Sequence, residues 1–110
     1  MAHENILFDK TEIVMTIVSK RTRTVNLSYE QIVSVSLEPA RERRYGIFPY
    51  DSERIVIRTR IMREPFAFYK SKEKHFFDLY KKQFRVFCKE NRVTFYDKTA
   101  ETEQVQIKEE

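Results

Sequence analysis

Residues 71–91, SKEKHFFDLYKKQFRVFCKEN, are the stretch that decides the fold class. At about 100° per residue, its apolar residues fall on one side of a predicted helix. They are Phe76, Phe77, Tyr80, Phe84, Phe87 and Cys88, and lysines dominate the opposite side. Ser71 is expected to be the N-cap, and Asn91 suits the C-terminal cap position. We therefore expect one C-terminal helix that covers a sheet with its aromatic side and shows water a basic side.

The residues before this helix alternate between apolar and polar side chains, as strands do. Strands are predicted at residues 5–8, 12–19, 24–29, 32–37, 54–62 and 66–70, with a last short strand at 93–96. Val33 and Ile61 are expected to face the core together with the other apolar residues of their strands. A run of strands closed by a single helix indicates the α+β class.

Pro39 is predicted to mark the boundary between a strand and an irregular segment in the middle of the chain. Pro39 is expected to end the fourth strand, because proline cannot donate a ladder hydrogen bond. Residues 40–52 are then expected to form the least regular segment of the chain, which holds Gly46 and Pro49. Such loops carry function more often than the strands that support them.

Length and charge indicate one small domain with a tail. The 110 residues include nine Phe and six Tyr, which suffice for the core of one domain. The net charge is +4, but residues 98–110 hold four glutamates against two lysines, which leaves +6 on residues 1–97. We expect a single domain at 1–97 and an acidic, disordered tail at 98–110. A basic body could bind anions, with the tail as an internal competitor.

The composition disfavours several classes of function. Cys88 is the sole cysteine, so no internal disulfide is expected, and a cytoplasmic location is the expectation. Gly46 is the sole glycine, whereas phosphate-cradling loops need several. We find no catalytic, cofactor-binding or metal-binding motif in the sequence, and we therefore do not expect an enzyme.

Residues 27–35, LSYEQIVSV, carry a family resemblance. The pattern apolar-x-Tyr-x-x-Ile-x-x-Val resembles the strand–corner–strand signature of bacterial pleckstrin-homology-like and GRAM-like domains. The resemblance implies a bent antiparallel sheet or partial barrel, capped by one C-terminal helix. Domains of this family bind lipids, peptides or protein partners. Their phosphoinositide sites use basic residues near the first long hairpin, a place that Lys20, Arg21 and Arg23 could occupy here.

The expected loop combines the residue types that dominate binding hot spots. Arg41, Arg43 and Arg44 are followed by three aromatic residues, Tyr45, Phe48 and Tyr50. The aromatics would supply contact area, and the arginines would supply charge complementarity. The sequence thus predicts a non-catalytic domain that recognises a protein or peptide partner through this Arg/aromatic loop.

Two alternatives remain at this point. Arg54, Arg58 and Arg60 are expected to share the outer face of a strand, and with the basic turn at residues 20–23 they could bind an anionic surface. That surface would be membrane lipid headgroups or nucleic acid, and nucleic acid is the less expected of the two because the RNP signatures of RNA-binding sheets are missing. A homo-oligomer formed through an exposed strand edge is the second alternative.

Overall fold

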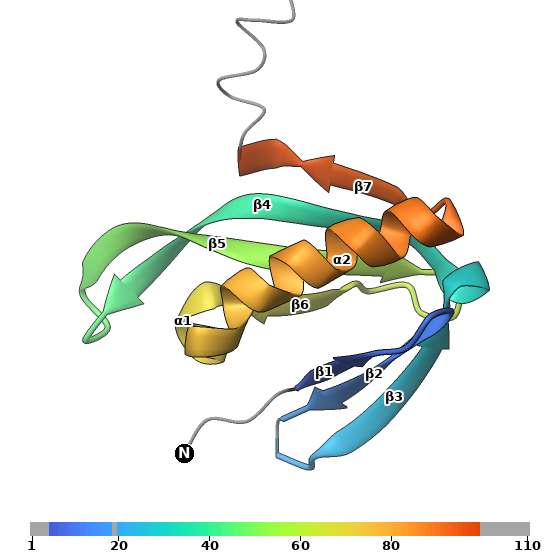
Figure 1. The fold of residues 1–110 in the computed structure, drawn as a ribbon. Coiled ribbons are helices and arrows are strands. Elements are labelled where there is room, and N and C mark those ends of the chain that lie inside the picture. Colours follow the sequence, from blue (N-terminus) through green and yellow to red (C-terminus); the bar gives the residue numbers. More distant parts are fainter. Residues whose placement is uncertain (1–4, 19, 100–110) are drawn as a thin grey trace, which may run out of the picture.

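The structure is a computed structural model that describes residues 5–18 and 20–99. Within these residues the strands form two sheets, followed by a C-terminal helical segment (Figure 1). The first sheet is antiparallel in the order β1-β2-β3, with β1 (Ile6–Phe8), β2 (Glu12–Ile17) and β3 (Arg23–Ser28). The second sheet has the order β6-β5-β4-β7, with β4 (Ile32–Arg44), β5 (Phe48–Thr59), β6 (Phe66–Tyr69) and β7 (Thr94–Asp97). The predicted α+β class is confirmed.

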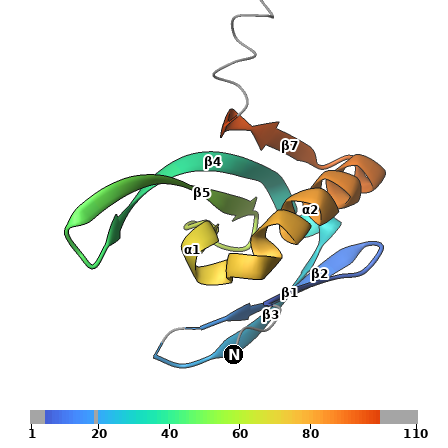
Figure 2. The ribbon, with the colours of Figure 1, turned by 60° about the vertical axis from the view of Figure 1, so that its left-hand side comes forward.

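The C-terminal helical segment covers the sheets as its apolar side predicted. It consists of α1 (Lys70–Glu73), the 3₁₀ turn η2 (Lys74–Phe76) and α2 (Phe77–Asn91). Helix α2 lies between the two sheets (Figures 1 and 2). Its buried residues are Phe77, Tyr80, Phe84, Phe87 and Cys88, all of which were expected on the apolar side. The two sheets do not join into a closed barrel, and α2 fills the space between them.

Both ends of the helical segment differ from the expectation. Tyr69, rather than Ser71, precedes the first helical residue, and Ser71 lies inside α1, where its hydroxyl donates to Glu42. Asn91 is the last residue of α2, and its side-chain amide donates to the carbonyl oxygens of Lys10 and Phe87 at 2.8 and 3.0 Å. Arg92 follows in the left-handed conformation that commonly ends a helix.

A short corner carries the chain from the first sheet to the second. It is the 3₁₀ helix η1 (Tyr29–Gln31), capped by Ser28. The Ser28 hydroxyl accepts from the backbone N–H of Glu30 at 3.3 Å, and the Gln31 side chain accepts from the backbone N–H of Ser28 at 2.9 Å. This reciprocal capping holds the turn at the residues on which the family resemblance rests.

Several details of the strands depart from simple alternation. The register shifts between Ile32 and Ser34, so Ser34 is buried and Val33 is 45 % exposed, contrary to the prediction. Ile61 was also expected to face the core, but it follows the end of β5 and is 49 % exposed. Strand β7 pairs with β4 in parallel, so the second sheet is mixed rather than purely antiparallel.

The largest correction concerns Pro39. Strand β4 does not end there; Pro39 pairs with Glu53, and the ladder continues to the pair Arg44 and Phe48. The flanking strands are much shorter, because β7 pairs only with Ser34 to Leu37 of β4, and β6 only with residues 54–57 of β5. Residues 38–44 and 48–53 therefore form a two-stranded ribbon that projects from the sheet (Figures 1 and 2). A proline is tolerated in β4 because, among the residues that the structure describes, each ribbon strand is paired along one edge only.

Candidate functional site

The ribbon ends in a tight turn with unusual backbone geometry. The N–H of Ile47 donates to the carbonyl of Arg44 at 3.2 Å, and the two residues between them have positive φ, 57° at Tyr45 and 78° at Gly46. Two positive φ values are what a type I′ hairpin turn requires, and Asn, Asp or Gly usually supply them. Gly46 adopts this conformation without strain, whereas a residue with a Cβ, such as Tyr45, loses roughly 1 kcal/mol.

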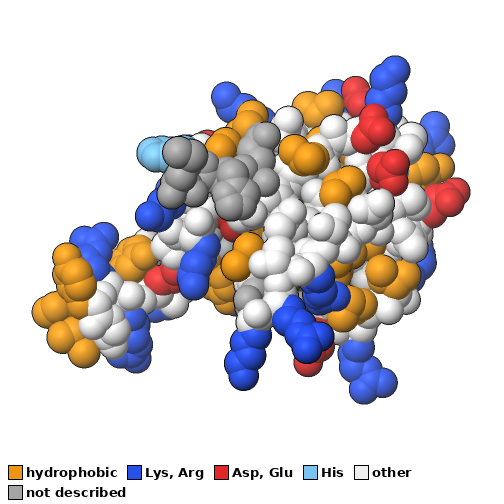
Figure 3. Space-filling view, turned by 90° about the horizontal axis from the view of Figure 1, so that it is seen from below, with side chains coloured by type: hydrophobic (Ala, Val, Ile, Leu, Met, Phe, Trp, Pro, Cys, Tyr) orange, Lys and Arg blue, Asp and Glu red, His pale blue; other side chains and the backbone are white. Residues whose placement is uncertain are grey.

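The side chains at this turn are apolar and exposed. The exposed fractions are 85 % for Tyr45, 64 % for Ile47 and 58 % for Phe48. Figure 3 shows hydrophobic side chains and Lys or Arg gathered on the projecting end of the molecule. We call residues 43–50 the ribbon tip. A strained, exposed Tyr45 adds nothing to the core of its own chain, and backbone strain of this kind concentrates at functional sites.

The ribbon tip is positively charged. Arg43 and Arg44 are its charged residues, and residues 43–50 contain no Asp or Glu. The Arg44 guanidinium lies over the Tyr50 ring, 4.9 Å from its centroid. The nearest acids in sequence are engaged below the tip, Asp51 with Arg41 at 3.7 Å and Glu42 with Ser71.

Glu42 fastens the ribbon to the helical segment. Burial raises the pKa of this carboxyl, but hydrogen bonds from Ser71 and Ser52 outweigh it, so the pKa is lowered overall. A second tie joins Glu53 of β5 to Lys81 of α2 at 3.3 Å. The lower half of the ribbon is thus held in place, and the tip extends beyond these contacts.

The predicted partner-binding residues do lie together, although not in a loop. Arg41, Arg43 and Arg44 are on β4, Tyr45 is in the turn, and Phe48 and Tyr50 are on β5. The expectation of an irregular segment at 40–52 was wrong, because the segment is a regular hairpin. Sequence reasoning missed Ile47, which is as exposed as its aromatic neighbours. Its place directly after Gly46 is the signal that could have identified it as a turn residue.

The second predicted set does not form one site. Arg54 and Arg58 lie on the outer face of the second sheet, but Arg60 lies beyond β5, where its side chain donates to the carbonyl of Glu30 at 3.1 Å. Lys20 and Arg21 lie in the turn between β2 and β3, and Arg23 begins β3. The basic turn and the basic strand face therefore belong to different sheets.

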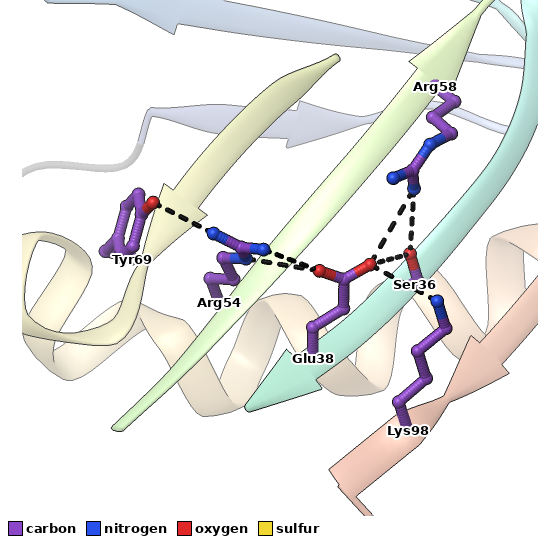
Figure 4. A network of polar contacts seen from close by, with 6 residues as sticks. All are labelled: Ser36, Glu38, Arg54, Arg58, Tyr69 and Lys98. Atoms are coloured by element: carbon purple, nitrogen blue, oxygen red, sulfur yellow. Dashed lines mark hydrogen bonds and ion pairs between the residues drawn. The ribbon is translucent and has the colours of Figure 1, made fainter. Parts of the chain in front are cut away.

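Arg54 and Arg58 surround a buried carboxylate (Figure 4). Glu38 is 7 % exposed and accepts from Arg54 at 3.0 and 3.2 Å and from the Ser36 hydroxyl at 3.1 Å. Arg58 and Lys98 lie 3.7 and 3.6 Å from its second oxygen. A further Arg54 nitrogen donates to the Tyr69 hydroxyl at 3.2 Å, so the network joins β4, β5, β6 and the residue after β7.

Hydrogen bonding controls the charge state of this carboxylate. Burial raises the pKa of Glu38, but the hydrogen bonds from Arg54 and Ser36 outweigh it, so the pKa is lowered overall. Glu38 consequently carries its charge at neutral pH and holds the cations around it. Arg54 and Arg58 are thus engaged with a group of the protein itself, which weakens the case for them as an anion-binding face.

The described residues offer little for catalysis. Burial raises the pKa of the Cys88 thiol to about 12, so it is not a thiolate at neutral pH. No group of three His, Cys, Asp or Glu side chains within residues 5–18 and 20–99 is arranged to hold a metal ion. Over the same residues, no helix has the length and apolar character that crossing a membrane requires.

Searches of protein-family models, curated proteins and solved structures give no match to this chain. The ribbon tip and the Glu38 network are therefore interpreted from their own geometry.

Proposed function

We propose that this chain is a non-catalytic interaction domain, and that it binds a protein or peptide partner through the ribbon tip. The observation that carries the proposal is the combination at the turn: Tyr45, Ile47 and Phe48 are exposed together, and the tip carries two arginines and no acid. Such side chains cost solubility and, at Tyr45, backbone energy, which a partner surface would offset.

The geometry of the tip supports a partner with an apolar hollow and an acidic rim. A projecting hairpin presents a convex surface, so its apolar side chains are best buried in a concave one. Arg44 is stacked on Tyr50, which orders the guanidinium before binding and reduces the entropy lost on association. Carboxylates at the rim would pair with Arg43 and Arg44.

The pleckstrin-homology-like resemblance and the cytoplasmic location remain parts of this proposal. The corner at residues 28–32 supports the resemblance, because η1 redirects the chain from one sheet to the next. Binding of an anionic membrane is the competing explanation, since Tyr, Ile and Phe beside arginines also suit a lipid interface. We favour a protein partner because Glu38 offsets part of the positive charge of Arg54 and Arg58, which weakens the basic surface beyond the tip.

The test compares a tip variant with a matched control. Ile47→Ser/Phe48→Ser removes two exposed apolar side chains at the tip, and Leu7→Ser/Val18→Ser removes two similarly exposed ones, on β1 and just after β2. Each tagged chain is used to capture proteins from the host, and the dissociation constant of each purified captured protein is then measured. We expect the tip variant to weaken binding about tenfold or more and the control to leave it unchanged.

Two results would overturn the proposal. The first is a tip variant that captures the same proteins with the affinity of the wild type. The second is wild-type binding to vesicles of phosphatidylcholine and phosphatidylserine that the tip variant loses, with no protein captured in a tip-dependent way. That second result would favour the membrane instead.

A further inference from the structure

Helix α2 has one side that remains exposed between the two sheets (Figure 1). The residues on this side recur at helical spacing, and they are Leu79, Gln83, Val86 and Glu90. We call these four residues the outer stripe. Leu79 is 40 % exposed and Val86 is 54 % exposed, although both are apolar. The outer stripe is thus a second apolar side of the helix, distinct from the side that fills the core.

A hollow lies beside the C-terminal half of the outer stripe. Its volume is about 280 Å³, and its lining is mainly apolar. Four of the lining residues are spaced i, i+3, i+4 and i+7 along α2, and they are Gln83, Val86, Phe87 and Glu90. Phe8, Asp9 and Lys82 complete the lining. Four helical residues at this spacing form the hole that receives a side chain of a neighbouring helix.

The same helix also carries a side chain that fits such a hollow. Leu79 lies one helical turn before Gln83, the first residue of the hole. When two copies of α2 lie antiparallel, Leu79 of each copy faces the hole of the other, so a single two-fold rotation fills both hollows. An unrelated helix would need a hole of its own for Leu79. This self-complementarity favours a second copy of the chain as the occupant.

The charges beside the outer stripe match in the same arrangement. The antiparallel pairing that brings Leu79 to the hole also brings Asp78 of one copy near Lys89 of the other, and the symmetry forms this pair twice. Asp78 already lies 3.7 Å from Lys81, but its side chain is 76 % exposed and can contact a second cation. A parallel pairing would instead place like charges together. Charges on facing helix flanks set partner choice and orientation, so they favour the antiparallel pair.

Gln83 provides an independent observation at the centre of the outer stripe. Its Oε1 atom is buried and has no hydrogen-bond partner among the described residues. An acceptor left unpaired in this way lowers stability. In the antiparallel pair Gln83 lies beside the two-fold axis, where the side-chain amide of Gln83 from the second copy can donate to it. Lys82 flanks the axis in both copies, and its ammonium group can donate to the same oxygen, which offsets the repulsion between the two lysines.

We propose that the chain forms a two-fold symmetric dimer through the outer stripe of α2, with Leu79 of each copy in the hollow of the other. The ribbon tip is not part of this interface, so the inference is independent of the proposed function. Only one helix of each copy takes part, so the interface is small and a dissociation constant in the micromolar range is expected. The dimer would present two ribbon tips, and a partner with two binding sites would be held more tightly by both.

The dimer is tested by sedimentation equilibrium of the full chain at about 5 to 500 µM, a range that spans a micromolar dissociation constant. We expect the mean mass to rise with concentration from that of one chain towards that of two. Leu79→Glu would place a charge in the hollow and should raise the dissociation constant about tenfold or more. Ile61→Glu is the matched control, because Ile61 is 49 % exposed and lies outside α2. A wild-type chain that stays monomeric, or a dimer that Leu79→Glu leaves intact, would overturn the inference.

A charge exchange tests the antiparallel arrangement. Asp78→Lys and Lys89→Asp should each weaken the dimer about three- to tenfold, because each brings like charges together at two symmetric places. The double variant Asp78→Lys/Lys89→Asp restores opposite charges across the interface and should regain the wild-type dissociation constant. A double variant as weak as the single variants would overturn the arrangement. The tip variant Ile47→Ser/Phe48→Ser should dimerise as the wild type does, and loss of its dimer would overturn the assignment of the interface to α2.

Discussion

The two halves of the β4–β5 hairpin differ in how their side chains are paired and buried, although the same two strands build both. In the lower half the buried carboxylate of Glu38 is surrounded by cations and a hydroxyl, and Glu42 and Glu53 are tied to the helical segment. At the tip, Tyr45 has a strained backbone and Phe48 an exposed ring. The lower half pairs its carboxylates with cations and hydroxyls, and the tip leaves apolar side chains in water.

The difference between the halves explains how the tip can exist. An isolated two-stranded ribbon is marginal in water, and a non-Gly residue with positive φ weakens it further. The network around Glu38 and the ties of Glu42 and Glu53 anchor the lower half, so the tip does not have to stabilise itself. We infer that the lower half is the structural part of the hairpin and the tip the part used for recognition.

The largest expected effect comes from breaking the anchored half. Glu38→Gln removes the buried charge and leaves Arg54, Arg58 and Lys98 facing one another. We expect a loss of about 1–2 kcal/mol in the free energy of unfolding, measured by urea denaturation, because hydrogen bonds to a charged group are lost and the three partly exposed cations are left to repel one another. Glu90→Gln on the exposed side of α2 is the control. A loss below about 0.5 kcal/mol, the range of ordinary surface changes, would contradict a structural role for Glu38.

Acid should weaken the same half. The pKa values of Glu38 and Glu42 are lowered in the folded chain, so their contribution to stability is present above their ordinary value of 4.5 and is lost as the pH falls through the lowered values. Urea denaturation from pH 7 to pH 3 should show stability falling below about pH 4.5. The fall should be shallower in Glu38→Gln. Identical pH profiles for the variant and the wild type would count against the network as the source.

Sequence reasoning succeeded where local spacing decides the structure. The apolar residues of α2 recur at helical intervals, so its buried side could be predicted without the fold. Sequence reasoning failed where the structure of a segment depends on strands that are distant in the sequence. Pro39 ends a strand only if both edges are paired, and nothing local shows that β7 stops at Leu37. The side chain of Val33 points outward because a bulge shifts the register, which alternation cannot reveal.

For the candidate site, too, one part could be predicted from the sequence and another part could not. The residue types at 41–50 could be recognised from composition alone, because Arg and Tyr together are typical of binding surfaces. Their arrangement on a projecting ribbon could not, because it depends on the unequal lengths of four strands. Likewise, Arg54 and Arg58 look like exposed charges in sequence. Only the pairing of β4 with β5 places Glu38 beside them.

A smaller effect of opposite sign is expected at the turn. Tyr45→Asn should raise the free energy of unfolding by roughly 0.5–1 kcal/mol, because Asn tolerates the left-handed region at this position of a type I′ turn. The same substitution should weaken partner binding, since the exposed ring is lost. Tyr96→Asn is the control, because Tyr96 is also exposed but lies within β7. A variant that is destabilised, or that binds as the wild type does, would show that Tyr45 does not exchange stability for recognition.

The smallest expected effect on stability is the difference between substitutions of two arginines in the same hairpin. Arg44→Gln removes a cation from the tip and its contact with Tyr50, and we expect it to change stability by less than about 0.5 kcal/mol. Arg58→Gln removes a partner of Glu38 and should cost more, about 0.5–1 kcal/mol. Partner binding should reverse this order: Arg44→Gln lowers the affinity and its dependence on salt, whereas Arg58→Gln leaves both unchanged. The two arginines lie on adjacent strands of one hairpin, so only the division between anchored base and exposed tip accounts for opposite orders. If both variants change stability and affinity in the same proportion, the hairpin acts as a single unit and that division is lost.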